Sequence, residues 1–310
     1  MILLLFLLIG MLKNGKCRYD GSPSLPYYSA EELGIKEEKF SSYSGKFRLN
    51  GSRYYEKDGR FKGVIVFFHG IGAGRSAYLK LISIFAKAGY LVYAYDNTGC
   101  MESEGQGYIG LGRVNYDQEA FFFFLNQDPK AKGYRRYVVG HSWGGYGALI
   151  ACKKKYRVEK AVSIAGFLRP SEEILFVMKK SQKGILPFLV SAALRLSTGK
   201  NGDLDAKEVI KDSDARILYI QGENDSLVPF KNNGNLLKEK FRDEKKIRFL
   251  FLKGRGHSPY LSKNAEDYSF SFIEDVAKTI EQENHPSLDI ERACELESKV
   301  IQAIIDFLNE

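Results

Sequence analysis

Short runs of apolar residues alternate along most of this chain with longer stretches in which apolar positions recur every three or four residues. The runs are apolar throughout, as expected for strands covered on both faces of a sheet. The stretches between them, such as residues 76–88 and 116–125, have the spacing of amphipathic helices. This alternation predicts an α/β fold with a doubly wound, mostly parallel sheet. The predicted strands are residues 63–68, 90–95, 137–139, 158–164, 216–220 and 247–252.

The alternation is interrupted between about residues 166 and 215. This segment contains two prolines and an apolar stretch at residues 184–196, and it is too long for an ordinary connection between two strands. We therefore predict a mostly helical cap over the functional site. A membrane-spanning segment is the alternative, but the thirteen residues of the apolar stretch, an arginine among them, are too few to cross a bilayer.

The two ends of the predicted sheet have less usual patterns. Residues 47–56 predict a hairpin that turns at Asn50-Gly51, a dipeptide favoured in tight turns. After the last strand, residues 264–283 and 288–309 both have the pattern of amphipathic helices, although one terminal helix would complete the fold. We expect the second helix to pack its apolar stripe on the sheet, and a dimer surface is the alternative.

The N-terminal segment, residues 1–18, begins with twelve uncharged, mostly apolar residues. Twelve are short of the roughly 20 that a spanning helix needs, and the segment lacks the basic start and the cleavage site of a complete signal peptide. We interpret it as a signal-anchor shortened by the placement of the start site; an interfacial or signal segment and a buried helix are the alternatives. It favours a membrane-associated protein, on a side left open, with a cytoplasmic protein as the alternative. Residues 19–45 predict a linker or arm with little regular structure.

Composition excludes some classes of partner. The 310 residues carry 46 Lys and Arg against 38 Asp and Glu, a formal net charge of +8. The basic residues are scattered in pairs and triplets, and no nucleic-acid-binding motif accompanies them, so we expect no nucleic-acid partner. The cysteines are far apart in the sequence, which indicates free thiols and offers no metal site. They are Cys17, Cys100, Cys152 and Cys294.

Candidate chemistry follows the strand that precedes residue 140. Gly140-His141-Ser142-Trp143-Gly144 fits the Gly-x-Ser-x-Gly nucleophile elbow. A serine at this strand-to-helix turn sits in a sharply bent backbone, and small residues two positions before and after it let strand and helix pack closely. The pattern predicts Ser142 as a nucleophile and the N–H of Trp143 as an oxyanion donor.

A serine hydroxyl needs a base within hydrogen-bond reach, itself held by a carboxylate. His257 follows the last predicted strand in a glycine-rich loop, the position at which open α/β sheets bind ligands, and we predict it as the base. Asp225 follows the preceding strand in the same way and is the predicted orienting acid, with Glu223 as the competitor. The other three of the four histidines are less well placed: His69, His141 and His285.

The oxyanion hole needs a second backbone donor. Residues 69–74 are rich in glycine and follow an early strand, which leaves the backbone free to approach a substrate oxygen. We assign this role to the N–H of Ile71, beside that of Trp143. A phosphate-binding loop is the alternative, but no Gly-Lys-Ser/Thr follows the glycines.

These motifs resemble the α/β-hydrolase fold superfamily over about residues 45–310, and within it the serine aminopeptidase-like and monoacylglycerol lipase-like group. The predicted domain is residues 46–310. One departure is visible, because the group's usual Asp-x-Arg-Gly-x-Gly-x-Ser loop appears as residues 96–103 without the arginine, so substrate preference does not carry over. The resemblance rests on the elbow and on residues 67–70, 89–96, 99–105, 222–229 and 256–257.

The resemblance implies a serine hydrolase that works through an acyl-enzyme on Ser142, His257 and Asp225, with no metal or organic cofactor. The apolar cap favours a carboxylic ester with a hydrophobic acyl group. An aminopeptidase acting on short peptides is the alternative, and a non-catalytic binding protein with the same fold is a third, although no triad member is lost. The sequence leaves the oligomeric state open. A peptidase needs a carboxylate for the substrate amine, and the cap offers Glu172, Glu173 and Asp203.

Overall fold

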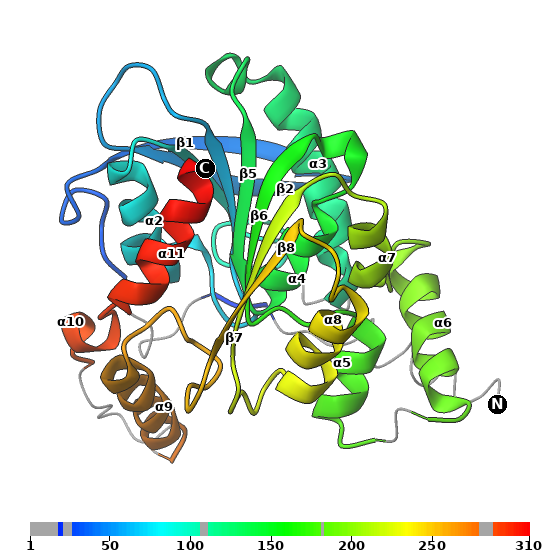
Figure 1. The fold of residues 1–310 in the computed structure, drawn as a ribbon. Helices are drawn as coiled ribbons and strands as arrows, with labels where there is room; N and C mark the ends of the chain where they lie inside the picture. Colours follow the sequence, from blue (N-terminus) through cyan, green and yellow to red (C-terminus); the bar gives the residue numbers. More distant parts are fainter. Residues whose placement is uncertain (1–17, 21–26, 106–110, 181–182, 279–287) are drawn as a thin grey trace.

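The computed structural model describes residues 18–20, 27–105, 111–180, 183–278 and 288–310. Within these residues, eight strands form one sheet in the order β1-β2-β4-β3-β5-β6-β7-β8 (Figure 1). The first two strands pair antiparallel and the other six are parallel. This architecture confirms the predicted fold class. The strands are β1 (Lys36–Ser44), β2 (Phe47–Tyr55), β3 (Val64–Phe68), β4 (Leu91–Tyr95), β5 (Arg136–His141), β6 (Val158–Ile164), β7 (Arg216–Gly222) and β8 (Ile247–Leu252).

Helices cover both faces of the sheet, because side chains of the central strands alternate between two apolar cores. In β3, Val64, Val66 and Phe68 enter one core, whereas Ile65 and Phe67 enter the other. The first core is covered by α3 (Val114–Gln127), α4 (Trp143–Ile150), α7 (Ala206–Lys211) and α8 (Gly234–Lys240). The second is covered by α2 (Leu79–Lys87) and α11 (Ser298–Asn309). Short 3₁₀ helices are η1 (Arg75–Tyr78), η2 (Leu111–Arg113), η3 (Pro129–Ala131), η4 (Lys154–Tyr156) and η5 (Phe230–Asn232).

Between β6 and β7 the chain leaves the sheet, and its described residues there form three helices. These are α5 (Pro170–Val177), α6 (Leu186–Thr198) and α7. Leu175 of α5 packs with Val190 and Leu194 of α6 in a small apolar cluster apart from the two main cores. In contrast, α7 buries Ala206 and Ile210 in the first main core. Thus α5 and α6 are the part of this insertion that stands away from the sheet (Figure 1).

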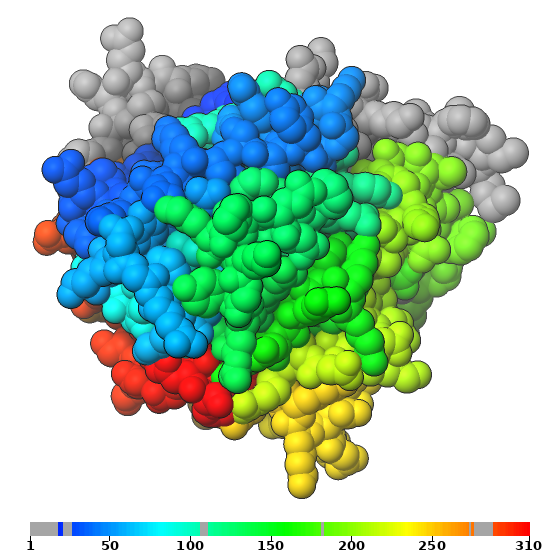
Figure 2. All heavy atoms as spheres, turned by 90° about the horizontal axis from the view of Figure 1, so that it is seen from above, coloured from blue at the N-terminus to red at the C-terminus, as the bar shows by residue number. Residues whose placement is uncertain are grey.

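The N-terminal hairpin corrects two expectations. Part of the segment predicted as a linker, residues 19–45, is the regular strand β1. The hairpin turns at Gly45, not at Asn50-Gly51. Ser44 pairs with Phe47 across the turn, which leaves a two-residue loop. Gly45, the first residue of that loop, has a φ of 62°, as such a turn requires. Seen from above in Figure 2, the blue hairpin lies against the green middle of the chain, where Phe40 stacks on Phe124 with ring centroids 4.9 Å apart.

Gly51 lies inside β2 because there is no room for a side chain at that position. A Cβ atom placed there would lie 2.5 Å from Cζ of Phe40 and 2.6 Å from the carbonyl oxygen of Ala94. The glycine therefore serves the packing of β1 and β4 against β2, and the preceding asparagine gave a misleading turn signal.

The C-terminal part contains α9 (Lys263–Lys278), α10 (Ile290–Ala293) and α11. The predicted second helix is thus divided in two, and Asp289 caps the start of α10 by accepting the N–H of Arg292 (3.1 Å). As expected, α11 packs its apolar stripe on the sheet through Val300, Ile304, Phe307 and Leu308.

None of the helices in the described part of the chain is both long and apolar enough to cross a bilayer. The expectation of membrane association rests on residues 1–18, of which residues 1–17 lie outside the described residues.

The packing around Gly51 gives a stability prediction. Gly51→Ala should lower the free energy of unfolding by about 1–3 kcal/mol, since the added methyl group overpacks the interface between the hairpin and β4. Urea denaturation measures this change. The exposed turn variant Lys46→Ala is the control and should stay within about 0.5 kcal/mol of the wild type; equal effects of the two substitutions would contradict the packing explanation.

Candidate active site

The backbone at Ser142 is bent sharply between β5 and α4. Ser142 has φ 58° and ψ −119°, a region that residues other than glycine rarely occupy. Its N–H donates to the carbonyl oxygen of Ile164 (2.8 Å). A Cβ atom at Gly140 would lie 2.1 Å from the carbonyl oxygen of Gly144, and one at Gly144 would lie 2.0 Å from that of Phe68. The strand, turn and helix predicted from the pentapeptide are therefore present, and the two glycines are required by close backbone packing.

Asp225 and His257 meet at the ends of the two neighbouring strands β7 and β8. Nδ1 of His257 lies 3.0 and 2.9 Å from the two carboxylate oxygens of Asp225. The same carboxylate accepts the N–H groups of Leu227 (3.0 Å) and Val228 (2.9 Å), which fixes its orientation. Glu223, the competing acid, is exposed. The structure thus brings together Asp225 and His257 as the sequence expected.

Ser142 and His257 line one cavity of about 440 Å³, which we call the elbow cavity. Ile71 lines it as well, whereas Trp143 is buried at the start of α4, where its indole N–H donates to the carbonyl oxygen of Leu111 (2.7 Å). The other walls are predominantly apolar. They include Phe167, Ile174, Val177, Met178, Leu227 and Val228.

His69, the first residue of the glycine-rich loop that contains Ile71, fixes the start of this loop through its ring. Nε2 of His69 accepts the backbone N–H of Asn97 (2.9 Å), so Nδ1 carries the proton and donates to the carbonyl oxygen of Gly70 (2.8 Å). Burial lowers the pKa of His69, and the ring is neutral at pH 7. Because both ring nitrogens of His69 form hydrogen bonds, neither is available to act as a base.

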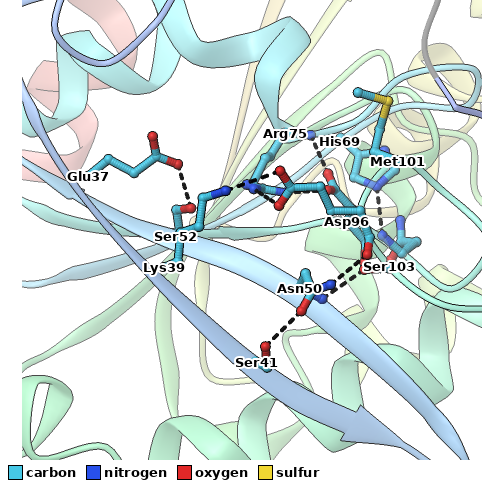
Figure 3. A network of polar contacts seen from close by, with 12 residues as sticks. Glu37, Lys39, Ser41, Asn50, Ser52, His69, Arg75, Asp96, Met101 and Ser103 are labelled. Atoms are coloured by element: carbon cyan, nitrogen blue, oxygen red, sulfur yellow. Dashed lines mark hydrogen bonds and ion pairs between the residues drawn. The ribbon is translucent and has the colours of Figure 1, made fainter.

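Arg75 fixes the other end of the same loop (Figure 3). Its backbone N–H donates to Asp96 (2.8 Å), and its guanidinium contacts Asp96 and Glu102, the latter at 2.7 Å. Burial raises the pKa of Asp96, and the charge of Arg75 opposes this shift. Ser103 donates to the carbonyl oxygen of Asp96 (2.6 Å) and so closes the loop at residues 96–103. The buried carboxylate of Asp96 is thus paired with an arginine of η1.

His141, beside the serine, joins the elbow to both neighbouring loops. Nε2 of His141 donates to the carbonyl oxygen of His257 (2.9 Å), so Nδ1 is the acceptor for the hydroxyl of Tyr78 (2.9 Å). That hydroxyl in turn accepts the N–H of Gly70 (3.2 Å). Burial, followed by the neighbouring charge of His257, lowers the pKa of His141 to about 3. Sequence reasoning missed Tyr78, which no motif marks.

Glu266 of α9 is a second residue that sequence reasoning missed. Its carboxylate accepts the N–H groups on both sides of His257, from Gly256 (3.1 Å) and Ser258 (2.7 Å). It also contacts Arg255 (3.3 Å). The loop that presents His257 is therefore held from outside by a helix of the C-terminal part.

Comparison with known proteins identifies the family. Residues 59–248 match the model of the family described as serine aminopeptidase, S33. The chain belongs to this family. It is a hydrolase of the α/β-hydrolase superfamily, as the sequence motifs suggested. No curated protein matches the sequence.

Solved structures of α/β-hydrolases resemble this S33 family member in fold. An esterase of Pyrococcus furiosus is 16% identical, with a TM-score of 0.61 over 85% of this chain and 99% of its own. An acylaminoacyl peptidase of Pyrococcus horikoshii is 16% identical, with a TM-score of 0.56 over 84% of this chain and 44% of its own. Est1E of Butyrivibrio proteoclasticus, with ferulic acid bound, is 12% identical, with a TM-score of 0.55 over 78% of this chain and 100% of its own. At these identities the likeness concerns the fold alone.

Of the three cap carboxylates considered from the sequence, the structure of the S33 hydrolase places Glu173 in the elbow cavity. Glu173 is 8% exposed, and burial, with the charge of Asp225 adding to it, raises its pKa to about 8. Asp203 is instead bonded to Arg169 and Ser171, both at 2.9 Å, and Glu172 lies 3.9 Å from Lys207. At neutral pH the cavity thus contains an uncharged carboxyl group.

The cysteines and potential metal ligands of the S33 hydrolase can be placed only where the structure describes them. Cys100, Cys152 and Cys294 are buried and form no disulfide among the described residues, and Cys17 and His285 lie outside those residues. Among the residues that the structure describes, no three His, Cys, Asp or Glu side chains come together as a metal site.

The low pKa of His141 predicts a pH-dependent stability. Below about pH 6.5 the unfolded chain binds a proton at this residue and the folded chain does not, so the free energy of unfolding falls as pH falls towards the folded pKa of about 3. His141→Gln should therefore reduce this slope by up to about 1.4 kcal/mol per pH unit, as measured by urea denaturation at a series of pH values.

Tyr78→Phe is the matched control for that experiment. It removes the hydroxyl that bonds Nδ1 of His141 but keeps the titrating ring, so its slope should follow that of the wild type even if its stability is lower. The same slope in His141→Gln and wild type would show that His141 is not the residue responsible.

Proposed function

We propose that the protein is a serine hydrolase that cleaves carboxylic esters with a hydrophobic acyl group. The observation that carries this proposal is that Ser142 and His257 line a single apolar cavity while the ring of His257 is hydrogen-bonded to Asp225. The membership of the chain in a hydrolase family supports the same reaction class.

The proposed reaction proceeds through an acyl-enzyme. Asp225 holds the Nδ1–H of His257, so Nε2 is the nitrogen that takes the proton of Ser142 as Oγ attacks the ester carbonyl. The carboxylate then stabilises the imidazolium, and the N–H groups of Ile71 and Trp143 are the proposed donors to the oxyanion. His257 returns the proton to the leaving alkoxide. Water, deprotonated by the same nitrogen, finally releases the acid and restores Ser142.

The walls of the elbow cavity support a hydrophobic acyl group. Ile174, Val177 and Met178 come from the end of α5, so we propose that α5 and α6 act as the cap predicted at about residues 166–215. Each methylene group that leaves water for such a surface contributes about 0.8 kcal/mol. Esters of medium-chain acids should accordingly bind better than acetates.

The catalytic assignment is tested with a fluorophosphonate probe and p-nitrophenyl esters of increasing acyl length. The probe should label Ser142, and Ser142→Ala should lower kcat by about 10⁴-fold or more while the fold is retained. Asp225→Asn should lower kcat by about 10³–10⁴-fold. Glu223→Gln is the matched control and should change little. Full activity of Ser142→Ala, or an equal loss in Glu223→Gln, would overturn the assignment.

A second candidate function, cleavage of an aminoacyl amide, is favoured by Glu173. A carboxyl group inside the elbow cavity would bind the ammonium group of a substrate once ionised. The two functions predict different dependences of KM on pH around the Glu173 pKa of about 8. Above that pH Glu173 is charged, so the KM of an apolar ester should rise. The KM of an aminoacyl anilide should instead be lowest near pH 8, where Glu173 is partly ionised and the substrate's amino group, with a pKa of about 7.7–8.0, still carries part of its charge.

The measurement that separates them is KM against pH for both substrates, with Glu173→Gln as the uncharged comparison. If the protein is an esterase, the rise in KM above about pH 8 should disappear in Glu173→Gln and the anilide should not be turned over. Turnover of the anilide that is lost in Glu173→Gln would instead establish the aminopeptidase.

A further inference from the structure

A second cavity adjoins the elbow cavity. Its volume is about 250 Å³, and Ile71, Tyr78 and His141 form walls of both. Ile71, which is half-exposed, belongs to the proposed oxyanion loop, and His141 precedes Ser142 in the chain. The second cavity therefore begins within a residue or two of the nucleophile.

The outer wall of this second cavity is built from the C-terminal elements α9 and α10 and the segment that follows α10. Ser269 comes from α9, Ala293 ends α10, and Cys294 and Leu296 follow α10. Figure 1 shows α9 and α10 together at one end of the molecule, below α2 and α11 in this view. Cys294 is 6% exposed, and burial raises the pKa of its thiol to about 11, so it contributes an uncharged surface.

This wall is tied directly to the loop of His257. Besides the bonds of Glu266, the N–H of Ser262 donates to the carbonyl oxygen of Glu295 (2.7 Å), and that of Glu297 donates to Tyr260 (2.8 Å). Arg255 forms an ion pair with Glu297 (3.0 Å). Residues 260–262 thus hold the segment after α10 in place, and the cavity between them keeps a fixed relation to His257.

We propose that the second cavity receives the alcohol part of the ester, while the elbow cavity receives the acyl part. This inference rests on the proposed esterase function. In that reaction the leaving oxygen takes its proton from His257, so the alcohol departs beside the loop of His257. Ser258, Tyr260 and Leu261 of that loop line the second cavity. The elbow cavity, which His257 itself also lines, extends to Ile174 and Val177 of α5.

The size and chemistry of the second cavity define the alcohol. At about 30 Å³ per heavy atom, the share of one water molecule in the liquid, the volume of about 250 Å³ holds about eight non-hydrogen atoms. Its walls are mostly aliphatic and aromatic side chains, among them Leu81, Tyr78 and Leu296, with Lys80, Ser258 and Ser269 as polar members. A compact apolar alcohol such as benzyl alcohol fits these limits, whereas a long alkyl chain exceeds them.

The test compares methyl, butyl and benzyl esters of one acid. Ser269→Leu fills the second cavity from a half-buried position on α9, and it should lower the ratio of kcat/KM for the benzyl ester to that for the methyl ester by about 10–100-fold. Ser271→Leu makes the same change at an exposed position of α9 outside this cavity and should leave the ratio unchanged. Because the acyl-enzyme is the same for all three esters, its rate of hydrolysis should be equal for all of them in each variant.

A measurement on the wild-type protein completes the test without any substitution. Added benzyl alcohol should capture the acyl-enzyme in preference to methanol: its oxygen attacks the acyl carbonyl, its proton passes to His257, and Ser142 is released with the benzyl ester as product. Three results would each overturn the second-cavity assignment. They are equal capture of the two alcohols, an unchanged benzyl-to-methyl ratio of kcat/KM in Ser269→Leu, and an effect of Ser269→Leu that depends on acyl length instead of on the alcohol. Absence of probe labelling at Ser142 would overturn the esterase itself and is distinct from these outcomes.

Discussion

The arrangement of the whole site depends on the bent backbone at Ser142. Its left-handed conformation costs about 1–3 kcal/mol and persists because the surroundings prevent it from relaxing. The N–H of Ser142 is bonded to Ile164, and Gly140 and Gly144 are packed against backbone atoms. The neighbours of β5 in the sheet contribute Phe68 of β3, which packs against Gly144, and Ile164 of β6, which accepts the N–H of Ser142, whereas Gly140 packs against Gly144 of α4 itself. The position of the serine hydroxyl is consequently set by the parallel core of the sheet, in which every residue of β3 and β4 is buried.

The same bend determines what the neighbouring histidine can do. The side chain of His141 points away from Ser142 and is buried. Its Nδ1 accepts the hydroxyl of Tyr78, and its Nε2 donates to the carbonyl oxygen of His257. A protonated ring would lose the bond from Tyr78 and would repel the imidazolium that the proposed mechanism forms at His257. Burial prevents this by keeping the pKa near 3. With His69 likewise neutral and fully bonded, His257 is the histidine beside Ser142 that retains a nitrogen for proton transfer.

Local patterns in the sequence were enough to predict the parallel strands and the elbow, and they placed Asp225 and His257 at adjoining strand ends. These features depend on a few consecutive residues and on the rule that parallel strands present their carboxyl ends together. The hairpin was misjudged because Asn50-Gly51 carries a strong turn signal, whereas Phe40 and the backbone of β4 leave no room for a side chain at position 51. Sequence reasoning missed three residues for a related reason: Tyr78, Arg75 and Glu266. Each contacts a residue that is distant in the sequence, and a short sequence motif cannot predict such a contact.

The C-terminal elements explain how the loop of His257 can be both glycine-rich and well positioned. Glycines on both sides of Arg255 leave that loop few side chains of its own to hold it. Glu266 compensates by accepting the N–H groups that flank His257, and Arg255 links the same loop to Glu297 before α11. Since these bonds come from α9 and from the segment after α10, the helices that enclose the second cavity also fix the histidine. A substitution of Glu266 would therefore disturb the position of His257. A substitution of Ser269, one helical turn further along α9, would change the cavity wall instead.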